Sequence, residues 1–445
     1  MDNFNKIKNK FETPNLDLVL KSKKTGTGSG GSSNLIYIKP NYILKVIPDY
    51  KKHWNQKYKL KNDQKEIEFY ERFTNKLILK NITPHIVGYY SKIKININDY
   101  LSKINCKSLL SLNTQIENEL KYFQDKYKKS KKVDKSKKVD KSKKVDKSKK
   151  TKRKGENILC KYSKGNTCFR GGIENFFDGV YLENCNTTIS NEFTNNLSNM
   201  TTNDIKSFID RVVFQYCYTM ISIYSLYPDF VHNDMFLRNI LAVNNTNYKN
   251  TDYIQYVIIS KSSKNKNETI INNYYFPTNG IMIKLNDFGF SLSSKGKLGD
   301  NLLAKDMNYK NKLCDNFHQS NMTTNISDNH DTYNFLHDLY DGANFGQKSL
   351  TTIINDSKLS KNKKKIYKTI IKETCNKYIN TNIIDLVNKY IKRKIDRIWN
   401  PHNISMLEKS VSKPIDYFEM DVFDKYKTLP KQDNFCIVKT FTVRL

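Results

Sequence analysis

The chain has 445 residues, of which 38% are hydrophobic and 12% aromatic, and its formal net charge at neutral pH is +32. This apolar content excludes wholesale disorder and predicts a buried core, while the length favours two or three domains. The positive charge suits nucleic acid, acidic proteins or anionic lipid as partners and does not choose among them.

The pattern of apolar residues predicts neither a signal sequence nor a membrane span. The first ten residues are polar, and the longest apolar stretch, near 216–227, is too short and interrupted to cross a bilayer. The eight cysteines form no C-x-x-C pair and no cluster with the spacing of zinc ligands. We therefore expect reduced thiols in a cytoplasmic compartment.

The first predicted elements are strands separated by a glycine-rich turn. Over about residues 17–47, the segments LDLVLKSK, LIYIK and YILKVI read as strands, and GTGSGGSSN lies between the first two. Gly26, Gly28 and Gly31 fit a G-x-G-x-x-G pattern, whose glycines let backbone N–H groups approach a phosphate. A dinucleotide-binding fold would place a helix after these glycines. Because a strand follows instead, the pattern favours a hairpin that covers the phosphates of ATP, with a flexible turn as the alternative.

The third strand and the next helix supply a candidate ion pair. Lys45 lies between apolar residues, where it either holds the α- and β-phosphates or points to solvent. Residues 63–80 carry apolar side chains three to four positions apart, which predicts a helix capped by Asp63. Glu66 on this helix is the candidate partner of Lys45, and Glu68 is the alternative.

A lysine-rich repeat separates these elements from the rest of the chain. KSKKVD occurs three times from residue 129 to residue 146. Residues 126–154 hold seventeen Lys or Arg against three Asp, so this segment carries fourteen of the net positive charges. With almost nothing apolar to bury, a disordered insertion is expected over 126–156. A tolerated loop expansion is the simpler interpretation, and a tether for nucleic acid or an acidic partner is the alternative.

A strand and a long helix are predicted after the repeat. Residues 179–185, GVYLENC, predict a strand that runs into a polar turn. Residues 203–227 predict a helix, with Asn203 or Asp204 as its cap.

The second half of the chain combines an insertion, a strand and helices. An insertion at 244–279 contains YIQYVIIS and NYYFP, which we expect to form an extra hairpin. Residues 280–285 predict a strand that leads to Asp-Phe-Gly at 287–289. Residues 331–445 are predicted to be mainly helical, for example at 382–399.

The polar stretch from Phe230 to Asn239, FVHNDMFLRN, best fits phosphoryl transfer from ATP. This reaction needs one carboxylate to orient the attacking hydroxyl and take its proton, and a second carboxylate with a carboxamide to hold Mg²⁺. Asp234 fits the first role, and Asp287 and Asn239 fit the metal-binding role. His232 is expected to brace the loop from behind. A polar turn in an asparagine-rich chain is the alternative, but four motifs in this order favour the catalytic interpretation.

These motifs resemble the protein-kinase-like superfamily over roughly residues 17–345. The segments HND and NYYFPTNGIMIKLNDFGFS are most similar to divergent kinase-like proteins of nucleocytoplasmic large DNA viruses. The resemblance implies an α+β, bilobal protein-kinase-like fold. Its antiparallel-sheet N-lobe would span 1–185, and its mainly helical C-lobe would span 186–445. The C-lobe would include the insertion at 244–279 and a helical C-terminal extension at 346–445.

The resemblance also implies ATP and Mg²⁺ as cofactors and adds residues to the site. Backbone groups at Glu183 and Cys185 would bind adenine. Asp331 would anchor the catalytic loop from below, with a helix cap as the alternative role. Serine/threonine kinases usually carry a phosphate-steering lysine where Phe236 stands in this chain. Arg238 is the candidate to supply that positive charge.

The function expected from these residues is an ATP- and Mg²⁺-dependent phosphotransferase. The first candidate is a serine/threonine protein kinase that transfers the γ-phosphate to a hydroxyl of a protein substrate. The sequence contains no A-P-E segment after Asp-Phe-Gly, so a small-molecule kinase of the aminoglycoside or choline type is an alternative. A kinase-fold scaffold, tethered through 126–154, is another. The composition suits a giant-virus source, with the host cytoplasm or the virion as its location.

Overall fold

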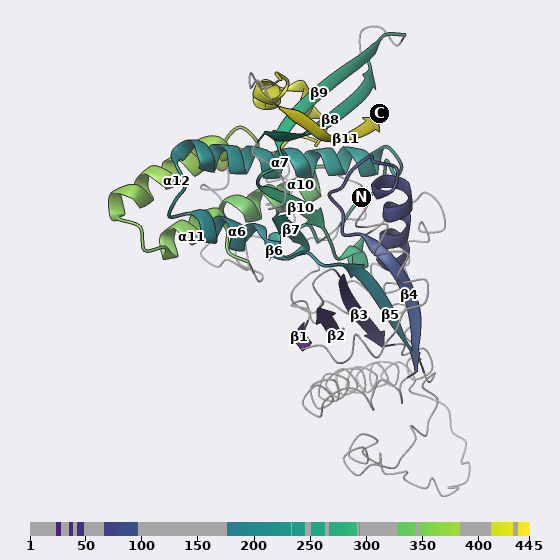
Figure 1. Cartoon of the computed structure of the whole chain (residues 1–445). Coiled ribbons are helices and arrows are strands. Elements are labelled where there is room, and N and C mark those ends of the chain that lie inside the picture. The colour runs from purple at the N-terminus through teal and green to yellow at the C-terminus, as the bar shows by residue number, and fades with distance from the viewer. Residues whose placement is uncertain are drawn as a thin grey trace, which may run out of the picture. The chain divides into compact units, whose positions relative to one another are not determined.

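The computed structural model describes most of the chain around the predicted motifs. The described residues are 24–27, 35–38, 42–48, 66–96, 176–232, 234–244, 251–262, 267–291, 293, 328–342, 347–382, 411–429 and 435–445. They fall into two compact units (Figure 1). The first unit comprises 2–60 and 90–182, and the second comprises 61–89 and 183–445.

The first unit is built on a five-stranded sheet. The strand order is β1-β2-β3-β5-β4, with bounds Lys24–Thr27, Leu35–Ile38, Tyr42–Pro48, Phe176–Glu183 and Tyr89–Asn96.

The strand predicted at LDLVLKSK lies outside the described residues, and β1, which pairs antiparallel with β2, begins after it. Strands β2 and β3 lie where LIYIK and YILKVI predicted strands, and they pair antiparallel. Lys45 lies opposite Ile36 in this ladder. Gly26, which we expected in the turn, belongs to β1 itself, where the register shifts between Lys24 and Thr27. Glycine tolerates such an irregularity because it has no side chain to place. Gly28 and Gly31 lie outside the described residues.

The second unit combines helices with short strands. Residues 66–73 are α-helical and continue into a π-helical turn at Thr74–Ile78. A small sheet has the order β10-β7-β6. Its strands and the helices of this unit are β6 (Thr187–Thr188), α6 (Ile189–Asn196), α7 (Thr202–Tyr224), η3 (Leu237–Asn239), β7 (Ile240–Asn244), β10 (Ile281–Leu285), η4 (Phe288–Phe290), α10 (Asp328–Asp341), α11 (Leu350–Asp356), α12 (Lys361–Cys375), α16 (Asp416–Glu419) and η6 (Asp421–Tyr426).

Helix α7 is the long helix predicted at 203–227, but its cap lies earlier than expected. Thr201 is the N-cap, and it forms a capping box with Asp204. The Thr201 side chain accepts a hydrogen bond from the Asp204 N–H, and the Asp204 carboxylate accepts one from the Thr201 N–H. This reciprocal pair satisfies two backbone donors, which explains why the helix begins at Thr202.

A second sheet is formed by the insertion together with a strand near residue 440. Strands β8 (Asp252–Lys261) and β9 (Thr269–Pro277) form the expected hairpin, and β11 (Cys436–Arg444) pairs in parallel with β8. The expectation of a helical extension over 346–445 is therefore wrong at β11. Its sequence CIVKTFTVR buries alternate residues, Phe441 and Val443, which is the period of a strand and not of a helix. Most of the helix predicted at 382–399 lies outside the described residues.

This second sheet packs on α7 through aromatic side chains. Phe214 of α7 lies within 5.5 Å, between ring centroids, of Tyr256 on β8, of Tyr274 and Phe276 on β9, and of Phe418 and Phe423. Large buried rings supply most of the apolar area in such a core. The inserted hairpin is thus part of the folded core beside the helix that leads into the polar loop. In the part of the chain that the structure describes, no helix is both long enough and apolar enough to span a membrane.

Candidate active site

The pairing of β7 with β10 brings the two polar motifs together. Ile240, the first residue of β7, lies opposite Leu285, the last residue of β10. The residue just before β7 therefore meets the residue just after β10, and the Asn286 N–H donates a hydrogen bond to the Asn239 carbonyl at 2.9 Å. Residues separated by 47 positions in the chain thus become neighbours, as the metal-site assignment requires.

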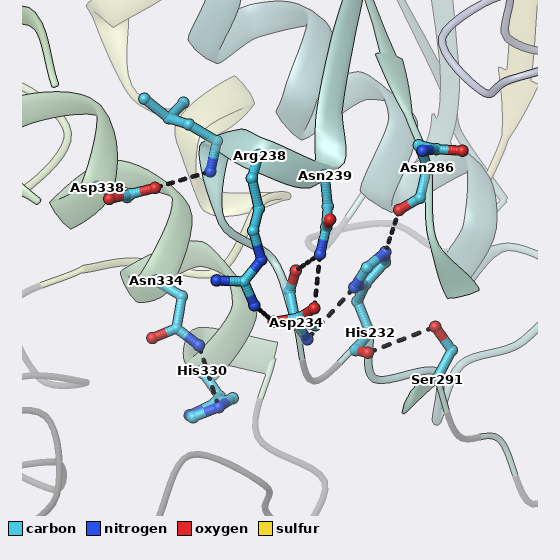
Figure 2. A network of polar contacts seen from close by, with 10 residues as sticks. His232, Asp234, Arg238, Asn239, Asn286, Ser291, His330, Asn334 and Asp338 are labelled. Carbon is cyan, nitrogen blue, oxygen red and sulfur yellow. Dashed lines mark hydrogen bonds and ion pairs between the residues drawn. The ribbon is translucent and has the colours of Figure 1, made fainter. Parts of the chain in front are cut away.

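Asp234 and Asn239 are in direct contact (Figure 2). The Asn239 Nδ2 donates to the main-chain oxygen and to Oδ2 of Asp234, at 2.7 Å in both cases. Both side chains are buried. Because the amide nitrogen faces Asp234, the Asn239 Oδ1 is the atom left to bind a hard cation, which prefers oxygen ligands.

Arg238 forms an ion pair with the Asp234 Oδ1, and both side chains are less than one-tenth exposed. The guanidinium also lies over the ring of Phe236, 4.9 Å from its centroid. The residue expected to supply a positive charge for phosphate is thus placed on the carboxylate itself.

Burial raises the pKa of Asp234 to about 7. The Arg238 guanidinium opposes this change, whereas the negative charge of Asp287 adds to it. A carboxyl group that titrates near neutral pH is suited to accept a proton in a general-base step.

His232 holds the polar loop against the turn before Asp287, as expected. Its backbone N–H donates to Asp331 Oδ2 at 2.6 Å, and its Nε2 lies 3.1 Å from the Asn286 carbonyl. A carbonyl only accepts hydrogen bonds, so Nε2 carries the proton. Burial lowers the pKa of His232, and the neutral ring then accepts the Asp234 N–H at Nδ1, at 3.3 Å.

A second aspartate on α10 holds the loop and was not found in the sequence. Asp338 accepts the Leu237 N–H at 2.8 Å, which fixes the start of η3, and burial raises its pKa to about 6. Asp331, inferred from the resemblance, lies seven residues earlier. Two helical turns separate the two carboxylates, so both lie on one face of α10. This spacing is the signal that sequence reasoning could have used.

Asp287 adopts a left-handed backbone conformation, with φ 61° and ψ 68°. Its Oδ1 and the Oε2 of Glu66 lie 3.5 Å and 3.9 Å from the point where a Cβ on Gly289 would stand. Glu66, only 3% exposed, therefore lies beside the Asp-Phe-Gly turn, whereas its alternative Glu68 is half-buried. Lys45 and Gly26 belong to the other compact unit, so the Lys45–Glu66 pair stays a prediction.

Glu183 is held by a contact that the sequence did not reveal. Its carboxylate accepts hydrogen bonds from the Lys284 Nζ at 2.9 Å and from the Gly88 N–H at 3.0 Å, and its own N–H donates to the Gly88 carbonyl at 2.8 Å. Lys284 is buried on β10, so the ion pair ties the last residue of β5 to the strand before Asp287. Burial raises the pKa of the neighbouring Cys185 thiol far above its usual range. The adenine contacts of Glu183 and Cys185 stay a prediction.

The donor set of the site suits Mg²⁺. Within the described residues, no group of three or more His, Cys, Asp or Glu side chains could hold a metal ion. Mg²⁺ at phosphoryl-transfer sites is usually held by one or two protein oxygens together with phosphates and water. Asp287 and Asn239 supply oxygen ligands of this kind.

The chain is similar over nearly its whole length to a giant-virus protein. A "Putative serine/threonine-protein kinase" of Acanthamoeba polyphaga mimivirus is 30% identical over 451 residues, and the alignment covers 96% of each chain. No protein-family model matches the sequence.

Proposed function

The chain belongs to the protein-kinase-like family of giant-virus proteins, and from this premise we propose that it is an ATP- and Mg²⁺-dependent serine/threonine protein kinase. The observation that carries the proposal is the contact between Asp234 and Asn239, beside the turn that leads to Asp287. A proton-accepting carboxylate beside two oxygen ligands is what transfer of a γ-phosphate to a hydroxyl requires.

In this proposal Asp234 orients the substrate hydroxyl and takes its proton. Its buried position and raised pKa support that role, and the Arg238 guanidinium stabilises the ionised form. Asn239 and Asp287 hold Mg²⁺, which when bound neutralises the charge on the β- and γ-phosphates. His232, Asp331 and Asp338 keep the loop rigid from behind.

The remaining assignments complete the nucleotide site. Gly26, Gly28, Gly31 and Lys45 contact the phosphates, Glu66 pairs with Lys45, and the backbone at Glu183 and Cys185 binds adenine. Residues 1–185 form the N-lobe of a bilobal fold, and residues 186–445 form its C-lobe. The substrate is a protein, in the host cytoplasm or the virion.

The proposal is tested by replacing Asp234→Asn, which keeps the shape of the side chain and removes its negative charge. Transfer of labelled phosphate from ATP to the protein itself or to generic protein substrates should fall by at least about a hundredfold, the usual size of a general-base contribution. Nucleotide binding, measured by titration with Mg²⁺ present, should be largely retained.

Asp356→Asn is the matched control, because Asp356 is exposed and, among the described residues, its ion pair is with the exposed Lys348. It should leave transfer unchanged. Full transfer by Asp234→Asn would overturn the assigned base. Transfer by the wild type to a metabolite but to no protein would favour the small-molecule kinase, and no transfer at all would favour the scaffold.

A further inference from the structure

The hydroxyl of Tyr70 is buried at the turn that precedes Asp287. Tyr70 lies on the helix that carries Glu66, and its side chain is 2% exposed. The hydroxyl donates a hydrogen bond to Asn286 Oδ1 and accepts one from the Asp287 N–H at 2.9 Å. A phenol has a single proton, which here is donated to Asn286, so the hydroxyl oxygen can only accept from the Asp287 N–H. The two hydrogen bonds together fix the positions of Asn286 and Asp287 relative to the Tyr70 ring.

Asn286 is held from three sides. Its N–H donates to the Asn239 carbonyl, its own carbonyl accepts from His232, and its side chain accepts from Tyr70. The residue immediately before Asp287 is thereby joined to the main chain of Asn239, to the polar loop and to the helix of Glu66.

Asp287 needs such support because its backbone is in a disfavoured region. Its φ of 61° lies where an L-residue brings its Cβ close to the carbonyl oxygen. Among the described residues, Asn81 is the one other non-glycine residue with a positive φ. Glycine would adopt this conformation without cost, whereas an aspartate must be held in it by neighbouring groups. The Tyr70 hydroxyl is the acceptor for the N–H of this residue.

The ring and the hydroxyl of Tyr70 act on the same turn. The ring packs edge-to-face on Phe288, with 5.1 Å between centroids. Burial also raises the pKa of Tyr70 well above its usual range, so the hydroxyl keeps the proton that it donates to Asn286. Phenylalanine at this position would keep the packing and remove only the two hydrogen bonds.

We propose that Tyr70 and Asn286 are positioning residues that hold Asp287 in the left-handed conformation from which its carboxylate binds the cation. This inference rests on the proposed function, since it assigns Asp287 to Mg²⁺. It adds that the affinity for the cation is set from the Glu66 helix, by one hydroxyl group.

The test compares wild type with Tyr70→Phe, Asn286→Ala and the double variant. Binding of a fluorescent ADP analogue is followed as Mg²⁺ is added, and binding is also measured without metal. In each single variant the Mg²⁺ concentration at half-saturation should rise roughly tenfold, the scale of leaving a buried donor or acceptor without its partner. The double variant should be no worse than the more affected single variant, because both changes remove the same contact. Metal-free nucleotide binding should stay unchanged.

Tyr367→Phe is the matched control. Tyr367 is also buried, and its hydroxyl donates to the Met200 carbonyl at the start of α7. The Tyr367→Phe variant should reach half-saturation at the same Mg²⁺ concentration as the wild type. Thermal unfolding should show that every variant is folded at the assay temperature.

Four outcomes would overturn the inference. A wild-type Mg²⁺ midpoint in Tyr70→Phe, or additive effects in the double variant, would overturn the positioning role and leave the kinase proposal intact. Equal losses of metal-free and metal-dependent binding would show a merely structural role. Nucleotide binding by the wild type that does not depend on Mg²⁺ would overturn the proposed function together with this inference.

Discussion

Asp234 is enclosed by protein, and its ionisation is set by opposing neighbours. Burial and the charge of Asp287 raise its pKa, and the Arg238 guanidinium lowers it, with a result of about 7. A kinase that needs this carboxylate in its ionised form should therefore respond to pH within the physiological range.

The expected profile has a definite sign. In the proposed mechanism the ionised form of Asp234 accepts the proton, so kcat/KM should rise with pH up to about 7 and level off above it. Arg238→Gln removes the neighbouring positive charge, which should shift this rise to higher pH. The check is a pH–rate profile of both proteins, with Lys348→Gln, a change in an exposed ion pair, as the control. An unshifted rise in Arg238→Gln would contradict the assigned coupling.

At the scale of elements, the inserted sheet holds the loop that follows the Glu66 helix. The Thr442 N–H of β11 donates to the Asn81 carbonyl at 3.1 Å, and His85 lies between the Ile283 carbonyl at 3.1 Å and the Tyr256 hydroxyl at 2.8 Å. Burial lowers the pKa of His85 to about 3, so the ring is neutral. A carbonyl only accepts hydrogen bonds, so the single ring proton of neutral His85 lies on Nδ1 and is donated to the Ile283 carbonyl. The unprotonated Nε2 then accepts a hydrogen bond from the Tyr256 hydroxyl.

A pair of facing tyrosines tests this contact. Tyr256→Phe leaves the buried His85 Nε2 without its donor, and the free energy of unfolding should fall by about 1–3 kcal/mol. Tyr274 lies directly opposite Tyr256 in the sheet, and its buried hydroxyl has no hydrogen-bond partner among the described residues. Tyr274→Phe should therefore change stability little. The measurement is urea-induced unfolding. Equal losses of unfolding free energy in the two variants would show that the hydrogen bond to His85 does not stabilise the fold.

At the scale of the whole molecule, charge is the dominant sequence feature. Residues 126–154 lie outside the described residues, and they carry fourteen of the 32 net positive charges. If they tether the protein to a polyanion, binding should weaken steeply with salt, because neutralising phosphates releases counterions.

Deletion of 126–154 tests the tether. Retention on heparin or single-stranded DNA should require less salt for elution in the deletion variant than in wild type, with little sequence preference among DNA probes. Phosphate transfer to a generic protein substrate serves as the control and should persist. If retention on heparin or DNA does not depend on salt, or is unchanged by the deletion, residues 126–154 do not bind polyanions.

Local sequence patterns identify the residues that could carry out the chemistry. The glycines, the strand lysine, His-Asn-Asp and Asp-Phe-Gly can each be recognised in a short stretch of sequence, and they occur in the order expected of a kinase. The hairpin of the insertion and the helix at 202–224 can also be predicted, because the spacing of apolar residues reveals both. Asp234, Asn239 and Asp287 could therefore be named before any fold was known.

The groups that hold these residues in place are revealed only by the three-dimensional fold. The contacts of Tyr70 with Asn286 and of Thr442 with Asn81 join positions more than 200 residues apart, and no local period records such a pairing. Phe441 and Val443 alternate like a strand, yet only the fold shows that β11 lies parallel to β8. The sequence offers Arg238 as a positive charge for phosphate, and only the fold shows that its guanidinium pairs with Asp234. Local patterns fix what a segment can become, whereas burial and long-range hydrogen bonds fix what it contacts.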